Sequence, residues 1–148
     1  MNSFNRQFNM FRSRFHGTPV LVRNTLFFTY CTSFYGVQIC DLKRMNKLHS
    51  AYQRAVRGLW NLPFRTHCCL IPGITGALCS VRMCIKRFLK FAILVMNHSA
   101  PVVQYVFRNA MKLQSSLFKF NLLYCLGSLG QSWDNLSSLD GELLKMTV

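Results

Sequence analysis

The sequence predicts an all-α protein, with about five amphipathic helices in a small irregular bundle and a loose C-terminal tail. Apolar residues recur every three or four positions in several long stretches, which is the period of a helix face. Most prolines and glycines fall between these stretches, where chain breaks are expected. Hydrophobic residues make up 51% of the 148 residues, enough to bury the core of one domain. We therefore expect a helical domain over residues 1–114 and a weakly structured tail over 115–148.

The first two helices are expected on either side of Gly17. Four phenylalanines are spaced to share one face of the first helix: Phe4, Phe8, Phe11 and Phe15. Gly17 suits the end of this helix, and Pro19 suits the first turn of the next. The second helix should run to about Tyr35 and stop at Gly36. Its β-branched and aromatic content leaves a strand as the alternative.

The third helix has the clearest amphipathic pattern in the chain. Asp41 suits its N-cap, and Asn61-Leu62-Pro63 stops it. Its apolar positions follow a 3.6-residue repeat: Leu42, Met45, Leu48, Tyr52, Val56, Leu59 and Trp60. Basic residues lie between them, on the flanks and the far side. Residues 64–79 are expected to be a loop because they contain Pro72, Gly73 and Gly76.

Two further helices are expected before the pattern weakens. Ser80 should cap the fourth, which runs to about Asn97. Ser99 and Pro101 together indicate the start of the fifth, which runs to about Leu113. Leu117–Leu126 is a candidate for a short additional helix within a tail rich in Ser, Gly and Leu.

The charge balance favours a polyanionic partner and disfavours catalysis. The chain has 18 basic residues, 4 acidic residues and a net charge of +14. Such a compact basic chain repels itself unless a polyanion neutralises it, so nucleic acid and an anionic membrane are the obvious partners. The acids are scattered, and they cannot build a two-metal phosphoryl-transfer site or a paired-carboxylate site. We expect no catalytic residue, no cofactor and no enzymatic activity for the chain as it stands. The four acids are Asp41, Asp134, Asp140 and Glu142.

Seven cysteines without a secretory signal indicate reduced thiols in an intracellular protein, nuclear or cytoplasmic rather than secreted. A zinc site is the alternative. Its ligands would come from His67, Cys68, Cys69, Cys79 and Cys84, a spacing that fits standard zinc knuckles only loosely. Buried structural thiols fit the pattern better, so no metal site is predicted.

A membrane is the less favoured partner. The longest uncharged runs, residues 24–40 and 91–107, span 17 residues each and contain polar side chains. A transmembrane helix needs about 20 mainly apolar residues. The first 16 residues are basic, acid-free and amphipathic, which also fits a mitochondrial presequence or a membrane-surface helix. We favour a helix of the domain itself, and keep the membrane-surface or mitochondrially targeted protein as the alternative.

Two stretches carry a resemblance to a known family: Leu26–Gln38, which reads LFFTYCTSFYGVQ, and Ala51–His67, which reads AYQRAVRGLWNLPFRTH. They resemble the thumb and connector that follow the polymerase domain in jockey-like non-LTR retrotransposon reverse transcriptases. The run KRFLKF at residues 86–91 is similar to the Arg-Phe element of the next helix in that family. The resemblance covers about residues 4–110. One departure is Cys40, near which the family often has Trp.

The resemblance implies a C-terminal fragment that lacks fingers and palm, because no Asp-Asp pair exists here for the catalytic palm motif. It implies a non-catalytic nucleic-acid-binding remnant of an RNA-directed DNA polymerase, whose thumb holds template–primer phosphates of RNA and/or DNA without sequence readout. The missing palm domain of a parent polymerase would be its protein partner. We expect an exposed apolar patch and poor solubility for the isolated chain. The candidate nucleic-acid-binding residues are Lys43, Arg44, Lys47, Arg54, Arg57, Arg65, His67, Lys86, Arg87 and Lys90.

Overall fold

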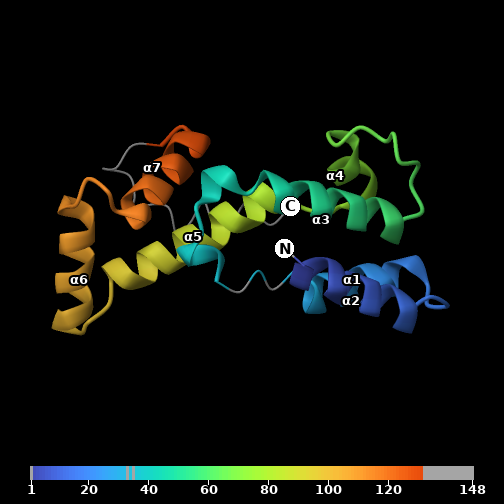
Figure 1. Ribbon diagram of the computed structural model, residues 1–148, viewed down its shortest axis with the longest axis horizontal. Coiled ribbons are helices and arrows are strands. Elements are labelled where there is room, and N and C mark those ends of the chain that lie inside the picture. The colour runs from blue at the N-terminus through green and yellow to red at the C-terminus, as the bar shows by residue number, and fades with distance from the viewer. Residues whose placement is uncertain (1, 33, 35, 132–148) are drawn as a thin grey trace. The chain divides into compact units, whose positions relative to one another are not determined.

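The computed structural model describes residues 2–32, 34 and 36–131, and these residues form helices and no strand (Figure 1). The all-α prediction is confirmed. The helix count was too low, because the described residues contain seven α-helices and two short 3-10 helices.

The chain divides into two compact units, which we describe separately. Unit 1 comprises residues 1–35 and 45–80, and unit 2 comprises residues 36–44 and 81–148. The chain therefore passes from one unit to the other three times.

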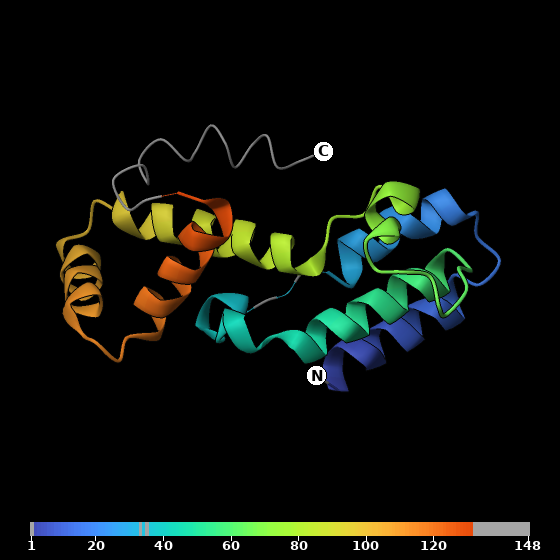
Figure 2. The ribbon, with the colours of Figure 1, turned by 90° about the horizontal axis from the view of Figure 1, so that it is seen from above.

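Unit 1 is built from α1 (Asn2–Arg14), α2 (Val20–Tyr30), α3 (Asn46–Leu59) and α4 (Leu70–Thr75). Helices α1 and α3 lie side by side, and α2 also packs against α3 (Figure 2). The fully buried Phe27 ring is the centre of the core. Its centroid lies 5.8, 6.0 and 6.1 Å from the rings of Phe8, Phe11 and Tyr52. The predicted phenylalanine face of the first helix is therefore an internal face of unit 1.

The second helix ends at Tyr30, five residues before the predicted end at Tyr35, which lies outside the described residues. Hydroxyl groups compete with the helical backbone near this end, because Thr29 and Thr32 donate to carbonyl oxygens four residues earlier. Gly36 then adopts a left-handed conformation with φ of 81°.

The predicted third helix is interrupted at Met45. Residues Leu42–Arg44 form the 3-10 helix η2, and α3 begins only at Asn46. Asp41 does act as a cap, but of η2, because its carboxylate accepts the Lys43 N–H at 3.1 Å. A long-range contact holds the segment that precedes α3, since the Leu42 N–H donates to the Asn121 side chain at 3.1 Å.

Residues 64–79 were predicted to be a loop, and this was wrong for α4. The helix buries Ile71 and Thr75 in unit 1. The Thr75 hydroxyl donates to the Ile71 carbonyl and accepts the Ala77 N–H, and Gly76 ends the helix with φ of 64°. Tertiary burial of one isoleucine therefore outweighs the helix-breaking composition of this segment.

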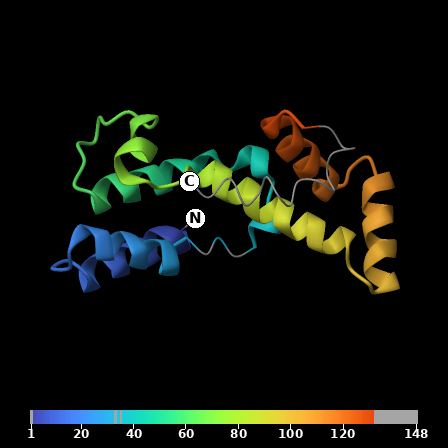
Figure 3. The same ribbon diagram turned by 180° about the vertical axis from the view of Figure 1, so that it is seen from behind.

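Unit 2 contains η1 (Val37–Ile39), η2, α5 (Ser80–Met96), α6 (Pro101–Lys112) and α7 (Leu117–Leu129). Figure 3 shows α6 and α7 from behind. The Phe118 ring of α7 meets rings from α5 and α6, with centroid distances of 5.3 Å to Phe88 and 5.7 Å to Phe107. Helix α6 starts with Pro101 as predicted, although its N-cap is Ala100 rather than Ser99.

Residues 117–129 form α7, which confirms the candidate short helix at Leu117–Leu126 and extends it by one turn into the segment expected to be loose. Ser116 caps this helix by accepting the Lys119 N–H at 3.4 Å. Asn121 is 1% exposed and binds the segment that precedes α3 through two hydrogen bonds. Its amide nitrogen donates to the Cys40 carbonyl at 2.7 Å, and its amide oxygen accepts the Leu42 N–H. The rest of the predicted tail, residues 132–148, lies outside the described residues.

Candidate nucleic-acid interface

The ten predicted binding residues are divided between the two units. Unit 1 holds Lys47, Arg54, Arg57, Arg65 and His67. Unit 2 holds Lys43, Arg44, Lys86, Arg87 and Lys90. Each set is therefore considered as a surface of its own unit.

Helix α3 presents a basic face to solvent. Lys47 and Arg54 are both exposed and lie seven residues apart, which is close to two full turns, so they project from the same side of the helix. Their separation along the axis is about 10.5 Å from the helical rise. The Tyr52 and Val56 side chains are buried in the core of unit 1. The helix is thus fixed by one face and leaves the two cations free to meet a ligand.

Arg57 was predicted to contact phosphate, but its guanidinium group binds the protein's own backbone. Its guanidinium Nε and Nη2 both donate to the Thr66 carbonyl oxygen, at 3.0 and 2.8 Å. The side chain is half-buried and joins the last turn of α3 to the loop that follows it. We call this pair of bonds the Arg57 latch. Arg57 therefore positions the loop, and its remaining N–H groups are the ones left for a phosphate.

A C-terminal cap at Asn61 and Leu62 fixes the start of this loop relative to α3. Asn61 adopts a left-handed conformation with φ of 52°, and the Leu62 N–H donates back to the Arg57 carbonyl at 2.9 Å. This is the Schellman arrangement that often ends a helix. The half-buried Trp60 is bound through its indole N–H to the Asn24 side chain at 3.0 Å, which fits its expected packing role.

A tight turn at the tip of the loop carries Phe64 and Arg65. The Thr66 N–H donates to the Pro63 carbonyl at 2.9 Å, which closes the turn. Phe64 is 80% exposed, and Arg65 beside it is also exposed. Phe64 is not among the residues that the sequence predicted to bind nucleic acid. The available signal was a phenylalanine directly after a proline, within a turn that offers it no core to enter.

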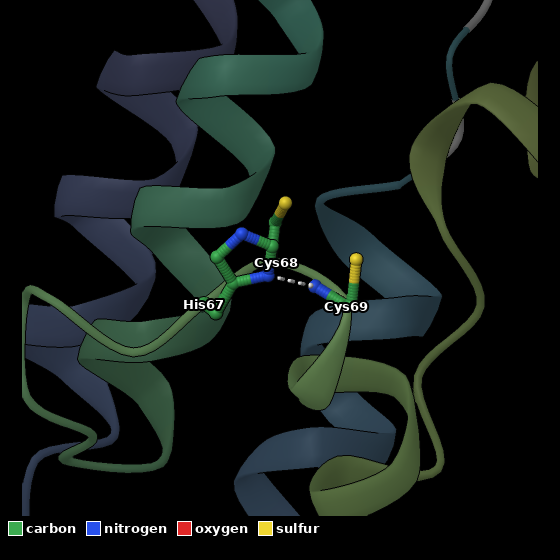
Figure 4. A group of neighbouring side chains, drawn as sticks. All are labelled: His67, Cys68 and Cys69. Carbon is green, nitrogen blue, oxygen red and sulfur yellow. Dashed lines mark hydrogen bonds between the residues drawn. The ribbon is translucent and has the colours of Figure 1, made fainter.

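The next turn brings three metal-binding residue types together (Figure 4). The ligand atoms of His67, Cys68 and Cys69 all lie within 4.8 Å of one another, and all three residues are exposed. The Cys69 N–H donates to His67 Nδ1 at 3.4 Å. The expectation of buried thiols was therefore wrong for these two cysteines, although it holds for Cys31, Cys84 and Cys125.

The other two cysteines of the alternative zinc set lie elsewhere. Cys79 is half-buried, with its Sγ 3.9 Å from His49 Nδ1, and Cys84 is buried in unit 2. Burial raises the pKa of the Cys31 thiol to about 11 and that of the Cys125 thiol to about 12. Both thiols stay protonated at neutral pH, so they are poor nucleophiles and poor metal ligands.

In unit 2, the basic residues predicted to bind nucleic acid lie on η2 and α5. Lys43 and Arg44 are exposed, and Arg44 forms an ion pair with Asp41 at 3.2 Å. On α5, Lys86 and Lys90 are one turn apart on the same side of the helix, with Lys90 exposed and Lys86 and Arg87 half-buried. Asp41 is the only acidic residue before Asp134, so no other carboxylate within residues 2–131 neutralises these cations.

His49 and Ser80 form a pair of the kind found in serine-type catalytic sites. His49 Nδ1 lies 2.8 Å from the Ser80 hydroxyl in unit 1. Ser80 is only 2% exposed, so a substrate has no access to its oxygen. The pair is a structural contact within unit 1, because Ser80 belongs to that unit although it is the first residue of α5.

The α1–α2 surface of unit 1 contains a groove of about 590 Å³. Apolar side chains of both helices line it, among them Met10, Leu26 and Tyr30, with Arg14 also present. None of the helices within residues 2–131 combines the length and apolar character needed to cross a bilayer.

Comparisons of this chain with protein-family models, with curated proteins and with solved structures find no match.

Proposed function

We propose that the protein is a non-catalytic nucleic-acid-binding module that holds the phosphate backbone of RNA or DNA through the outer face of α3 and the loop that follows it. The observation that carries this proposal is the exposed Lys47–Arg54 face. It stands on a helix anchored in the core, and only one acidic residue precedes Asp134. Phosphates are the ligand that such a surface binds without reading sequence.

The loop would extend this contact beyond the helix. Arg65 lies at the tip of a closed turn, and the Arg57 latch fixes that turn relative to α3. A fixed cation loses less side-chain freedom on binding than a mobile one does. Phe64 offers an exposed ring beside Arg65, and an exposed ring can stack on an unpaired base of any identity.

The resemblance of residues 26–38 and 51–67 to the thumb of jockey-like reverse transcriptases supports the same role. A thumb holds a template–primer duplex against a palm domain, and it needs cations on a rigid helix more than base-specific contacts. Under this proposal the catalytic carboxylates and the palm belong to a partner or to a longer polymerase. Lys43, Arg44, Lys86, Arg87 and Lys90 would form a second set of phosphate contacts on unit 2.

The membrane-surface alternative loses its main support in the structure. It relied on a phenylalanine face in the first helix that could enter a lipid surface. Phe4 and Phe11 are 6% and 5% exposed, and the Phe8 and Phe11 rings pack on Phe27. Lipid binding by this face would require α1 to leave the core of unit 1.

The salt dependence of binding tests the proposal. We would measure the affinity for a labelled RNA–DNA duplex and for single-stranded RNA by fluorescence anisotropy, at several salt concentrations. Each phosphate contact should contribute about −0.9 to the slope of log affinity against log salt for a duplex. Lys47→Gln/Arg54→Gln should therefore flatten the slope by about 1.8.

A charge-matched control separates a site from general attraction. Arg6→Gln/Arg108→Gln removes two exposed cations outside the proposed surface. It should leave the slope within experimental error. Phe64→Ala should weaken single-stranded binding by about 1–3 kcal/mol and leave duplex binding nearly unchanged. Equal losses in both double variants, or affinity that does not change with salt, would contradict the proposed interface.

A further inference from the structure

We propose that His67, Cys68 and Cys69 form a zinc site with two thiolate ligands, one imidazole ligand and an open fourth position. The observation behind it is that the three donor atoms lie within 4.8 Å of one another on one exposed turn. This inference does not depend on nucleic-acid binding.

The backbone fixes the turn at both of its ends. The Arg57 latch holds the Thr66 carbonyl immediately before His67, and the Leu70 N–H donates to the His67 carbonyl at 3.0 Å. Cys69 is the N-cap residue of α4, which is anchored by the buried Ile71. The three donors are therefore presented by a short segment whose flanks are already ordered, and this lowers the entropic cost of binding.

The histidine ring is oriented correctly for a ligand. The Nδ1 lone pair is directed at the backbone of Cys69, because Nδ1 accepts the Cys69 N–H. The bond is long, at 3.4 Å, so a metal ion can replace it at little cost. Figure 4 shows both sulfur atoms beside the imidazole ring on one side of the loop.

The spacing requires only a small closure. Two thiolates bound tetrahedrally at about 2.3 Å from zinc are about 3.8 Å apart. The present separations of up to 4.8 Å therefore need to shrink by roughly 1 Å. Rotation about χ1 of the two cysteines can supply this shift, since both residues are exposed.

The donor set selects the metal. Two cysteines and one histidine are soft and borderline ligands that favour zinc over magnesium or calcium. Each thiol releases its proton to solvent on binding, and the two thiolates then neutralise the divalent charge. A neutral complex avoids the repulsion that a bare dication would meet on a chain with a net charge of +14. Three protein ligands with one open position is a known zinc arrangement.

Cobalt substitution gives a direct readout on the full chain. The reduced protein would be titrated with Co²⁺ in the absence of oxygen. Near-ultraviolet absorption would monitor the sulfur-to-cobalt charge-transfer band. Zinc would then be added to displace the cobalt. We expect one ion per chain. Cys68→Ser/Cys69→Ser should abolish the charge-transfer band, and His67→Ala should weaken zinc binding at least tenfold.

The exposed Cys40 supplies the matched control. Cys40→Ser removes one exposed thiol of unit 2 and should leave stoichiometry and affinity unchanged. Circular dichroism would verify that each variant remains helical. The proposal is overturned if the Cys68→Ser/Cys69→Ser protein keeps the charge-transfer band, or if the folded wild-type chain shows none at millimolar Co²⁺.

Discussion

Arg57→Lys separates two roles that an arginine can have at the end of α3. The Arg57 latch consists of two hydrogen bonds, from Nε and Nη2, to a single carbonyl oxygen of Thr66. Lysine keeps the positive charge but cannot present two parallel donors. If Arg57 acts through its charge alone, the substitution should have little effect. If it acts through the latch, the loop should open more often.

The expected magnitude follows from the geometry. A hydrogen bond with one charged partner contributes about 1.5–3 kcal/mol when it is well shielded. Arg57 is half-buried and both of its bonds share one acceptor, so we expect a loss near the lower limit, about 1.4 kcal/mol. This free energy corresponds to a tenfold change in an equilibrium constant. The open population of the loop should therefore rise about tenfold.

Limited trypsin digestion measures this population at the peptide bond after Arg65. When the loop closes faster than it is cut, the cleavage rate follows the open fraction. The rate after Arg14, at the end of α1, provides an internal reference in the same unit. We expect cleavage after Arg65 to accelerate about tenfold in Arg57→Lys and at least as much in Arg57→Ala. The latch would be refuted if Arg57→Lys were cleaved after Arg65 at the wild-type rate and only Arg57→Ala were cleaved faster. That result would favour a purely electrostatic role for Arg57.

Three further predictions concern stability. Asn121→Ala should lower the free energy of unfolding by about 2–4 kcal/mol in urea denaturation. The substitution leaves the Leu42 N–H and the Cys40 carbonyl without their buried partner. A change below about 1 kcal/mol would mean that water replaces the amide. Gly58→Ala should stabilise the protein by at most about 0.5–1 kcal/mol, since Gly58 lies in the last turn of α3 and an added Cβ meets the Phe8 ring at an ordinary 3.7 Å. Destabilisation in the same assay would indicate that α1 cannot accommodate a methyl group. The free energy of unfolding should be level below about pH 9 and should fall as pH rises toward about 11. The reason is that the Cys31 and Cys125 thiols have folded-state pKa values of about 11 and about 12, above the ordinary 9.0, so they ionise first in the unfolded chain. Serine at both positions should reduce this fall.

Helix α6 carries an exposed apolar surface. Helix α6 has no buried residue, and Val102, Tyr105 and Val106 are 73%, 69% and 60% exposed on one side of it. This accords with the apolar patch expected from the composition, although its effect on solubility is still a prediction. Glutamine at all three positions should shift the protein toward monomer in sedimentation, and unchanged self-association would exclude this patch as the cause.

Helices whose apolar pattern reflects one buried face were predictable from the sequence. The phenylalanines of α1, the amphipathic body of α3 and the stretch of α5 each have one face against a core, so the 3.6-residue period is visible. Helix α7 has apolar residues on most sides, from Leu117 through Leu126, and such a segment has no period to detect. Helix α4 was missed because Pro72 and Gly73 indicate a loop unless the burial of Ile71 is known.

The candidate site was predictable in its charges but not in its architecture. The sequence indicated Lys47, Arg54 and Arg65 as exposed cations, and all three are exposed. Whether they bind nucleic acid is still a prediction. The role of Arg57 could not be predicted, because the latch depends on where the chain places Thr66 nine residues later.

The sequence by itself determined the helical class and the excess of positive charge, since periodicity and composition are local properties of the chain. Tertiary structure decided where the helices break and what the polar side chains contact. Asn121 contacts Leu42, 79 residues earlier in the chain, and a turn between α3 and α4 gathers His67, Cys68 and Cys69 on an exposed surface. Such contacts depend on the distance between residues in space, which neighbouring positions in the sequence do not specify.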